Sequence, residues 1–300
     1  MLRQRTFVLL VMAVAAAAMP AWGQANSGAQ GAASIPDFSG VWTKPYIGIE
    51  PPLSGPRPVK SRFPTIAISV GDYTNPILRP HAAETVKKQG EIELSGVPIP
   101  NPRNQCWPEG VPLVFRDVGM QMFQQPDKIT ILYDYDHEVR RVRMNQPHST
   151  PVTPSWYGDS VGYYEGDTLV IDTVGVKIGP FPMVDIFGTP HTPALHVVER
   201  YRLLDYEAAI EAQEWGLKEN NRLRGAGGDA GLAMDPDYNG KGLQLQFTVE
   251  DEGVFTTPWS ATVTYRRALG VIPENVCAEN LRGTYVAKDS AVPQADKPDF

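Results

Sequence analysis

The side chains best suited to chemistry in this chain are histidines and carboxylates near the ends of expected strands. An imidazole titrates close to neutral pH and can carry protons, and a neighbouring carboxylate can orient it. An arginine can stabilise the charge that develops on an enolate or carboxylate. The expected catalytic set is His148, His191, His196, Arg200, Asp159 and Asp172. Gathered with Tyr201 inside an apolar cavity, it would suit a cofactor-independent lyase, isomerase or hydrolase acting on a small, partly hydrophobic oxygenated compound.

Residues 196–199 (HVVE) invite a metal-binding interpretation, because His-x-x-Glu binds metals on helices. On a strand, residues three apart face opposite sides. We therefore expect no metal here, and we expect either His196 with Arg200 or Glu199 with Tyr201 to face inward. No cofactor is predicted either, because the chain lacks a nucleotide-binding glycine loop, a Gly-x-Ser-x-Gly elbow and zinc-spaced Cys/His clusters.

A structural role is the alternative for each of these residues, because buried hydrogen-bond networks can also fix a barrel. His191 lies in a loop at residues 188–193 (GTPHTP), where prolines restrict the backbone and could hold the ring at a cavity mouth. Aromatic side chains could line the same cavity, since pockets for small ligands are mostly apolar. The expected ligand-binding residues are Trp156, Tyr163 and Tyr201.

Strands must position these residues, and the clearest pair is a hairpin over residues 156–173. Gly166 lies between two runs of strand-forming residues and suits the tight turn that joins them. The predicted strands are residues 120–124, 128–135, 138–144, 156–164, 168–176, 195–204, 206–215, 243–250 and 260–267. About nine strands with short connections favour an antiparallel meander closed into a barrel, because closure removes exposed edges. The predicted fold class is mostly all-β.

Proline shapes the region before these strands. Residues 45–112 are rich in proline, which excludes long helices and central strands over most of that stretch. We expect this segment to wrap the core or cover a barrel mouth. One short helix is expected at residues 80–89, with Pro80 at its first position and Gly90 just past its end.

The N-terminal residues have the features of a secretory signal. Arg3 and Arg5 precede an apolar run, and a small-x-small site predicts cleavage after Gly23. The run is shorter than the roughly 20 residues that span a bilayer. We therefore expect no membrane span in the mature form, with an uncleaved anchor as the lesser alternative. The predicted organisation is a signal peptide (1–23), a disordered leader (24–34), one barrel domain (35–285) with a Gly-rich insertion near 216–242, and a flexible tail (286–300).

Export, to a periplasm or the outside, would place the two cysteines in an oxidising compartment. We expect Cys106 and Cys277 to form a single disulfide. It would close a loop of about 170 residues and contribute on the order of 5 kcal/mol. Two free thiols are the alternative.

The overall charge argues against two kinds of partner. The formal net charge is −7 and the pI is about 5.3, whereas nucleic acids and anionic membranes favour basic surfaces. The basic run at residues 140–143 alternates with an apolar residue and predicts a solvated strand face. A small-molecule ligand or substrate is the expected partner.

Four motifs together resemble a large family of exported, mostly uncharacterised bacterial proteins. They are residues 36–42 (PDFSGVW), 156–160 (WYGDS), 165–170 (EGDTLV) and 195–200 (LHVVER). The resemblance covers nearly the whole mature chain and implies export, but it carries little about chemistry. Where that family has Asp-Gly-Arg-x-His-Pro, residues 145–149 are NQPHS, which keeps the histidine and changes the turn.

A looser resemblance is to lipocalins, whose first strand carries Gly-x-Trp. Here that motif is Gly40, Val41 and Trp42. The resemblance implies that the tryptophan packs against an arginine of a late strand, for which Arg266 or Arg267 could serve. It also implies a lipocalin-like barrel around a small ligand.

Three functions therefore stay open. An enzyme would have titrating histidines facing a hydrated cavity. A periplasmic carrier would have an apolar cavity with few charges. A structural, envelope-associated domain would have a filled core and no cavity.

Overall fold

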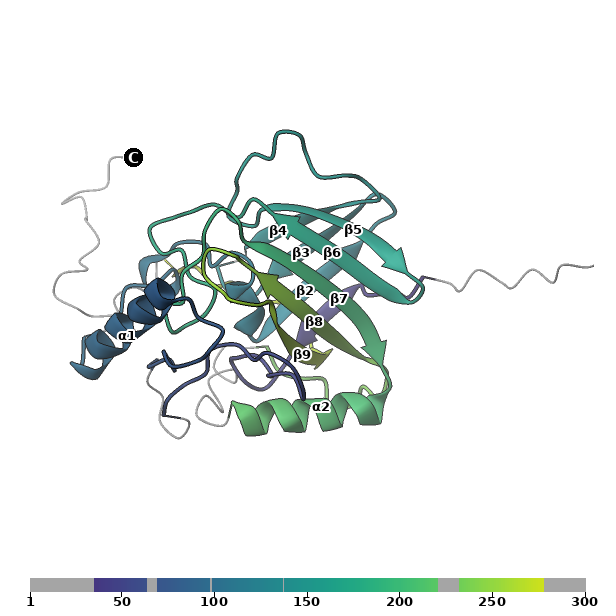
Figure 1. Ribbon diagram of the computed structural model, residues 1–300. Helices are drawn as coiled ribbons and strands as arrows, with labels where there is room; N and C mark the ends of the chain where they lie inside the picture. The colour runs from purple at the N-terminus through teal and green to yellow at the C-terminus, as the bar shows by residue number, and fades with distance from the viewer. Residues whose placement is uncertain (1–34, 64–68, 98, 137, 221–231, 278–300) are drawn as a thin grey trace, which may run out of the picture. The chain divides into compact units, whose positions relative to one another are not determined.

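Nine strands close into one barrel in the computed structural model of the protein (Figure 1). The structure describes residues 35–63, 69–97, 99–136, 138–220 and 232–277. The barrel strands in these ranges are β1 (Gly40–Thr43), β2 (Gly119–Gln124), β3 (Lys128–Tyr133), β4 (Val139–Met144), β5 (Asp159–Glu165), β6 (Thr168–Val174), β7 (His196–Leu204), β8 (Gly242–Glu250) and β9 (Trp259–Arg267). Their order in the barrel follows the chain, and β1 pairs with β9 to close it. The predicted all-β barrel is confirmed.

One pairing differs from the expected antiparallel meander. β4 and β5 run parallel, with Val142 opposite Ser160 and Met144 opposite Gly162. A parallel pair cannot be joined by a tight turn, because the chain must return to the end at which it started. Residues 145–158 make this return, which brings His148 beside the outer face of the neighbouring strands.

Helix α1 (Pro80–Leu94) begins at the predicted Pro80 but continues past the predicted end. Ala82, Val86 and Gly90 are buried at a spacing of four residues and therefore share one face. A Cβ atom at Gly90 would lie 3.0 Å from Val70 Cγ1. Gly90 thus permits close packing inside the helix and does not end it.

The strand predicted at residues 206–215 is wrong, because these residues lie in helix α2 (Tyr206–Glu219). The segment is rich in Ala and Glu, which favour helices more than strands. Its buried residues, Ala209, Gln213 and Gly216, lie three and four positions apart. This face rests on the barrel, where Gln213 Nε2 donates to the Thr264 carbonyl at 3.2 Å (Figure 1).

Trp42 packs as the lipocalin resemblance implies. The Arg267 guanidinium carbon lies 4.1 Å from the centre of the Trp42 ring, and the two residues are opposite each other where β1 meets β9. Arg267 also donates to the Ser39 carbonyl at 2.9 Å. The contact therefore fixes the strand pair that closes the barrel.

The proline-rich segment leaves β1 and crosses the end of the barrel, as predicted. Lys44 is buried at this exit and donates to the carbonyls of Tyr46, Gly48 and Arg116 at 2.9, 2.8 and 2.7 Å. Burial lowers the pKa of Lys44 to about 7. Glu50 then forms a bridge with Thr262 of β9, which holds the segment against the barrel.

Cys106 and Cys277 form the predicted disulfide, with an S–S distance of 2.12 Å and Cα atoms 5.5 Å apart. In the part of the chain that the structure describes, no helix is long and apolar enough to cross a membrane. The predicted signal peptide (1–23), leader (24–34) and tail (286–300) lie outside the described residues, as does the middle of the predicted 216–242 insertion.

Candidate functional site

Three of the predicted catalytic residues meet at one carboxylate oxygen. Nε2 of His148 lies 2.9 Å from Oδ1 of Asp172, and Nε2 of His196 lies 3.1 Å from the same atom. Asp172 comes from β6, His196 begins β7, and His148 comes from the loop before β5. An ionised carboxylate only accepts hydrogen bonds, so both Nε2 atoms carry a proton when both bonds form.

Further carboxylates surround these two rings. Nδ1 of His148 lies 3.4 Å from Oδ2 of Asp159, the fourth predicted residue of the set. Asp159 is held in turn by Arg143, at 2.6 Å, and by the backbone N–H of Ser149, also at 2.6 Å. Nδ1 of His196 lies 3.6 Å from Oε2 of Glu250. We call His148, Asp159, Asp172, His196 and Glu250 the histidine–carboxylate cluster.

The electrostatics of this cluster favour the protonated form of the His196 imidazole. The hydrogen bond to Asp172 raises the pKa of His196, against the opposing effect of partial burial. The hydrogen bond from His196 lowers the pKa of Asp172 in return. Partial burial alone would raise the pKa of Asp159, but the Ser149 N–H and the Arg143 side chain outweigh it, so the net pKa is lowered. The pKa shifts of His196 and Asp172 therefore favour an ion pair between these two side chains.

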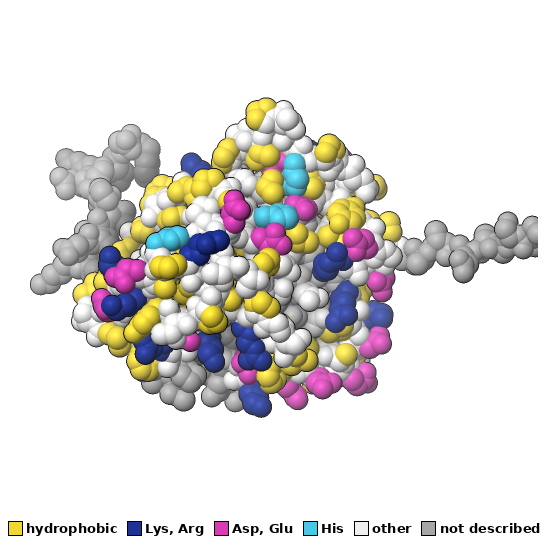
Figure 2. Space-filling view, viewed as in Figure 1, with side chains coloured by type: hydrophobic (Ala, Val, Ile, Leu, Met, Phe, Trp, Pro, Cys, Tyr) yellow, Lys and Arg dark blue, Asp and Glu magenta, His cyan; other side chains and the backbone are white. Residues whose placement is uncertain are grey.

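The cluster lies on the outer face of the barrel rather than inside it. Val197, Glu199 and Tyr201 of β7 point inward, so His196 and Arg200 point outward. The side chains of His148, Asp172 and His196 are 27%, 32% and 33% exposed. Figure 2 shows histidine and acidic side chains gathered on the surface over β6 and β7. The arrangement expected from the sequence, a polar cluster within an apolar cavity, is therefore corrected.

The remaining predicted catalytic residues lie apart from the cluster. His191 is buried in its loop, and desolvation lowers its pKa. Arg200 forms an exposed ion pair with Glu165 at 2.6 Å. Among the described residues, neither His191 nor Arg200 forms a hydrogen bond with His148 or His196. Their catalytic roles stay predictions.

The predicted ligand-binding aromatics also occupy three separate places. Trp156 packs against Trp107 with ring centres 5.4 Å apart. Nζ of Lys177 lies over the Trp156 ring, 4.9 Å from its centre. Tyr163 is 41% exposed on the outside of β5. Tyr201 is fully buried in the barrel and donates to Glu199 at 2.9 Å.

The barrel interior contains a buried ion pair that the sequence analysis missed. Arg140 donates to both oxygens of Glu199, at 2.9 and 2.6 Å, and to Ser160 and Thr173 at 3.1 and 2.7 Å. Both side chains of the pair are 0% exposed. The prediction that the whole basic run 140–143 is a solvated face is therefore wrong for Arg140. The alternation of that run on β4 could have shown it, since Arg140 and Val142 share a face.

A cavity of about 530 Å³ lies at the end of the barrel where β1 ends and β9 begins. We call it the end cavity. Its walls come from the proline-rich segment, from the turn before β2, from the loop between β6 and β7, and from the end of α2. Its lining includes four cations, which are Arg57, Lys60, Arg62 and Arg116, and three carboxylates, which are Asp72, Asp185 and Glu219. Its apolar lining includes Val59, Leu113, Ile186, Phe187, Phe247 and Trp259. None of the sequence-predicted site residues is among the residues that line this cavity.

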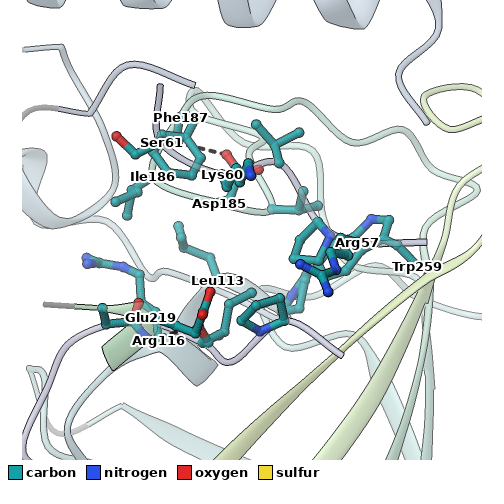
Figure 3. A pocket seen from close by; sticks show the side chains of 18 of the residues that line it. Arg57, Lys60, Ser61, Leu113, Arg116, Asp185, Ile186, Phe187, Glu219 and Trp259 are labelled. Carbon is teal, nitrogen blue, oxygen red and sulfur yellow. Dashed lines mark hydrogen bonds between the residues drawn. The ribbon is translucent and has the colours of Figure 1, made fainter. Parts of the chain in front are cut away.

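The end cavity has an apolar interior and charged edges. Phe247 and Trp259, 1% and 2% exposed, contact each other edge to face with ring centres 5.9 Å apart. In Figure 3, Asp185, Ile186 and Phe187 lie across the cavity from Leu113, Arg116 and Glu219. The proline content of residues 45–112 gave one indication of this site, because such a segment was expected to wrap the core or cover a barrel mouth. The three cations within residues 57–62 of the proline-rich segment are the signal that was missed.

No group of three or more His, Cys, Asp and Glu residues in the described ranges has the arrangement of a metal site. In comparisons with known proteins, no family model, no curated protein and no solved structure matches the chain.

Proposed function

We propose that this protein is exported and binds a small, partly hydrophobic compound in the end cavity. The observation that carries the proposal is the cavity of about 530 Å³ beside two buried aromatic rings. Pockets for small ligands have volumes of roughly 300–1,000 Å³ and are mostly apolar with a few polar groups. The signal-like N-terminus and the disulfide support export.

The side chains that form this cavity are held in place independently of any ligand. Phe247 contacts Phe115 as well as Trp259, and Trp259 contacts Phe255. The loop that carries Ile186 is fixed by Asp185, whose carboxylate accepts from the Phe187 N–H at 2.8 Å. A cavity with such walls needs little ordering on binding, which favours affinity.

Narrowing the cavity tests the proposal. Ile186→Trp places a larger side chain at the cavity wall, and Ile178→Trp makes the same change in the same loop at a site 44% exposed and outside the lining. We expect the neutral fluorescent probe N-phenyl-1-naphthylamine to bind the parent saturably. Its affinity should fall about tenfold or more, or 1.4 kcal/mol, in I186W and stay unchanged in I178W.

Two results would contradict the binding function. One is a parent protein that gives no saturable probe signal, and the other is equal probe affinity in both variants. The first would favour the structural alternative, in which the barrel is an envelope-associated domain.

A second candidate function is acid–base catalysis at the histidine–carboxylate cluster. It is favoured by the two imidazole Nε2 atoms at one oxygen of Asp172, a partly exposed arrangement that can pass protons to a bound compound. In this function His148 and His196 carry protons, and Asp159 and Asp172 orient them. The substrate would be a small oxygenated compound and the reaction a lyase, isomerase or hydrolase step.

Mass spectrometry of a metabolite extract tests this second function. A compound consumed by the parent and by His81→Gln, which changes an exposed histidine of α1, should be spared by the His148→Gln/His196→Gln double variant. Equal consumption by the double variant would exclude the cluster as the catalytic site.

A further inference from the structure

Two cations at the end cavity are held in position without a carboxylate partner. Arg57 and Lys60 are exposed at its edge, and within the described residues neither forms an ion pair. Their backbone is fixed on both sides, because Asn75 Nδ2 donates to the Arg57 carbonyl at 3.3 Å and the Asp72 N–H donates to the Lys60 carbonyl at 2.8 Å. The backbone that carries both cations is therefore fixed at the edge of the cavity.

The other two cations of the lining already have partners. Arg116 forms an ion pair with Glu109 at 2.8 Å. Arg62 lies over the Tyr73 ring, with its guanidinium carbon 4.6 Å from the ring centre. These contacts leave Arg57 and Lys60 as the cations best able to meet a ligand.

Two of the three carboxylates of the lining are engaged by their own segments. Asp72 accepts from the N–H and the hydroxyl of Thr74, at 3.1 and 2.6 Å. Asp185 accepts from two backbone N–H groups of its loop, and burial raises its pKa to about 6. Glu219, the third, is exposed at the last residue of α2. Asp72 and Asp185 are therefore held by their own segments, and an anion that enters the opening can pair with Arg57 and Lys60.

The interior behind these cations is apolar. Val59 lies between Arg57 and Lys60 in the chain and is 5% exposed, and Leu113 and Phe247 are 3% and 1% exposed. Burying an apolar chain against such side chains contributes about 0.8 kcal/mol for each methylene group. A ligand that satisfies both parts of the site has one anionic group and an apolar body.

We infer that the end cavity binds an amphipathic organic anion, whose acidic group pairs with Arg57 and Lys60 while its apolar body lies against Val59, Leu113 and Phe247. This inference rests on the proposed binding function and names its ligand class. The probes that test it are octanoate and octan-1-ol, which share a chain length and differ in charge.

The experiment measures how well each probe displaces N-phenyl-1-naphthylamine at pH 8 and low salt. The parent should bind octanoate about tenfold more tightly than octan-1-ol. Arg57→Gln with Lys60→Gln should remove this preference by weakening octanoate alone. The matched control, Lys128→Gln with Arg141→Gln, removes the same two charges from exposed sites on β3 and β4 that are not in the lining, and it should keep the preference.

The two proposals fail differently in this experiment. If the naphthylamine does not bind the parent, the proposed function fails. If it binds and the parent does not prefer octanoate over octan-1-ol, only the anion inference fails. An octanoate preference that survives in the Arg57/Lys60 variant would also overturn the inference, because another group would then recognise the charge.

Discussion

At the scale of single residues, Asp172 organises the most polar part of the outer barrel surface. It accepts from a ring on β7 and from a ring on the loop before β5. The pKa of His196 is raised by this contact, whereas desolvation lowers the pKa of His191. The two histidines should therefore titrate on opposite sides of the ordinary histidine value.

NMR titration of the histidine ring protons checks this prediction. His196 should titrate above about 6.5 and His191 below it. Asp172→Asn should lower the pKa of His196 and leave that of His191 unchanged. An unchanged His196 titration in that variant would show that Asp172 does not form the contact in solution.

The same contact predicts how stability depends on pH. A raised pKa of His196 gives stability that is present below the unfolded pKa and is lost as pH rises through the folded one. The lowered pKa of Asp172 gives stability that is present above its unfolded value, 3.8, and is lost as pH falls through the folded one. The loss of Tm in Asp172→Asn should therefore be larger at pH 5.5 than at pH 8.5. Equal losses at both values would contradict the ion pair.

Breaking the buried Arg140–Glu199 pair should destabilise the barrel strongly. Glu199→Leu leaves Arg140 buried without its partner, which costs about 3–5 kcal/mol of unfolding free energy. Arg140→Met together with Glu199→Leu should recover most of this loss, because replacing a buried pair by apolar side chains is often neutral. Urea unfolding measures both. A double variant as unstable as the single one would show that the hydrogen bonds of Ser160, Thr173 and Tyr201 matter more than the pair.

At the scale of elements, α2 depends on a glycine where it meets the proline-rich segment. A Cβ atom at Gly216 would lie 2.1 Å from the Tyr46 hydroxyl oxygen and 2.8 Å from Oε1 of Glu50. Alanine normally stabilises a helix interior by about 1 kcal/mol over glycine. Here the clash should reverse the sign, and Gly216→Ala should cost about 1–3 kcal/mol in urea unfolding.

Gly90 of α1 provides the comparison for this substitution. The nearest atom to a Cβ at Gly90 is Val70 Cγ1, at 3.0 Å, and the other neighbours are 3.8 Å or more away, so a small shift makes room for it. Gly90→Ala should therefore change the unfolding free energy by less than about 1 kcal/mol. A Gly216→Ala variant as stable as the parent would mean that α2 packs differently against residues 46–50.

Most strand positions could be predicted from alternation, but helix α2 and the parallel direction of the β4–β5 pair could not. Residues 206–215 alternate weakly and have no strong turn before them, so helix propensity in the Ala- and Glu-rich run was the better guide. The parallel pairing of β4 with β5 depends on how residues 145–158 fold back. A loop of that length permits either direction, so the local pattern contains no information about it.

The histidine–carboxylate cluster could be predicted in part, because most of its residues lie at the ends of predictable strands. Asp159, Asp172 and His196 lie near the same ends of β5, β6 and β7, where strand register brings them together, and the loop before β5 adds His148. Their face could not be decided from alternation alone, because both faces of β7 carry polar residues. The end cavity was missed because its lining comes from segments far apart in the chain, such as those of Arg57 and Trp259.

At the scale of the whole molecule, the disulfide joins residues far apart in the chain. Cys106 and Cys277 are separated by 171 positions, so the bond excludes many unfolded conformations. Cys106→Ser with Cys277→Ser should lower the unfolding free energy by about 5 kcal/mol at most. Adding a reductant to the parent should shift the urea midpoint in the same direction. A midpoint unaffected by either change would show that the bond does not constrain the unfolded chain.

Binding in the end cavity can be tested with a crystal structure of the protein soaked with 8-bromooctanoate, in which the anomalous signal of bromine locates the ligand. We expect a bromine peak inside the end cavity, among Leu113, Phe247 and Trp259, with the carboxylate toward Arg57 and Lys60. A peak only on the outer surface, or no peak at a concentration that displaces the fluorescent probe, would contradict it.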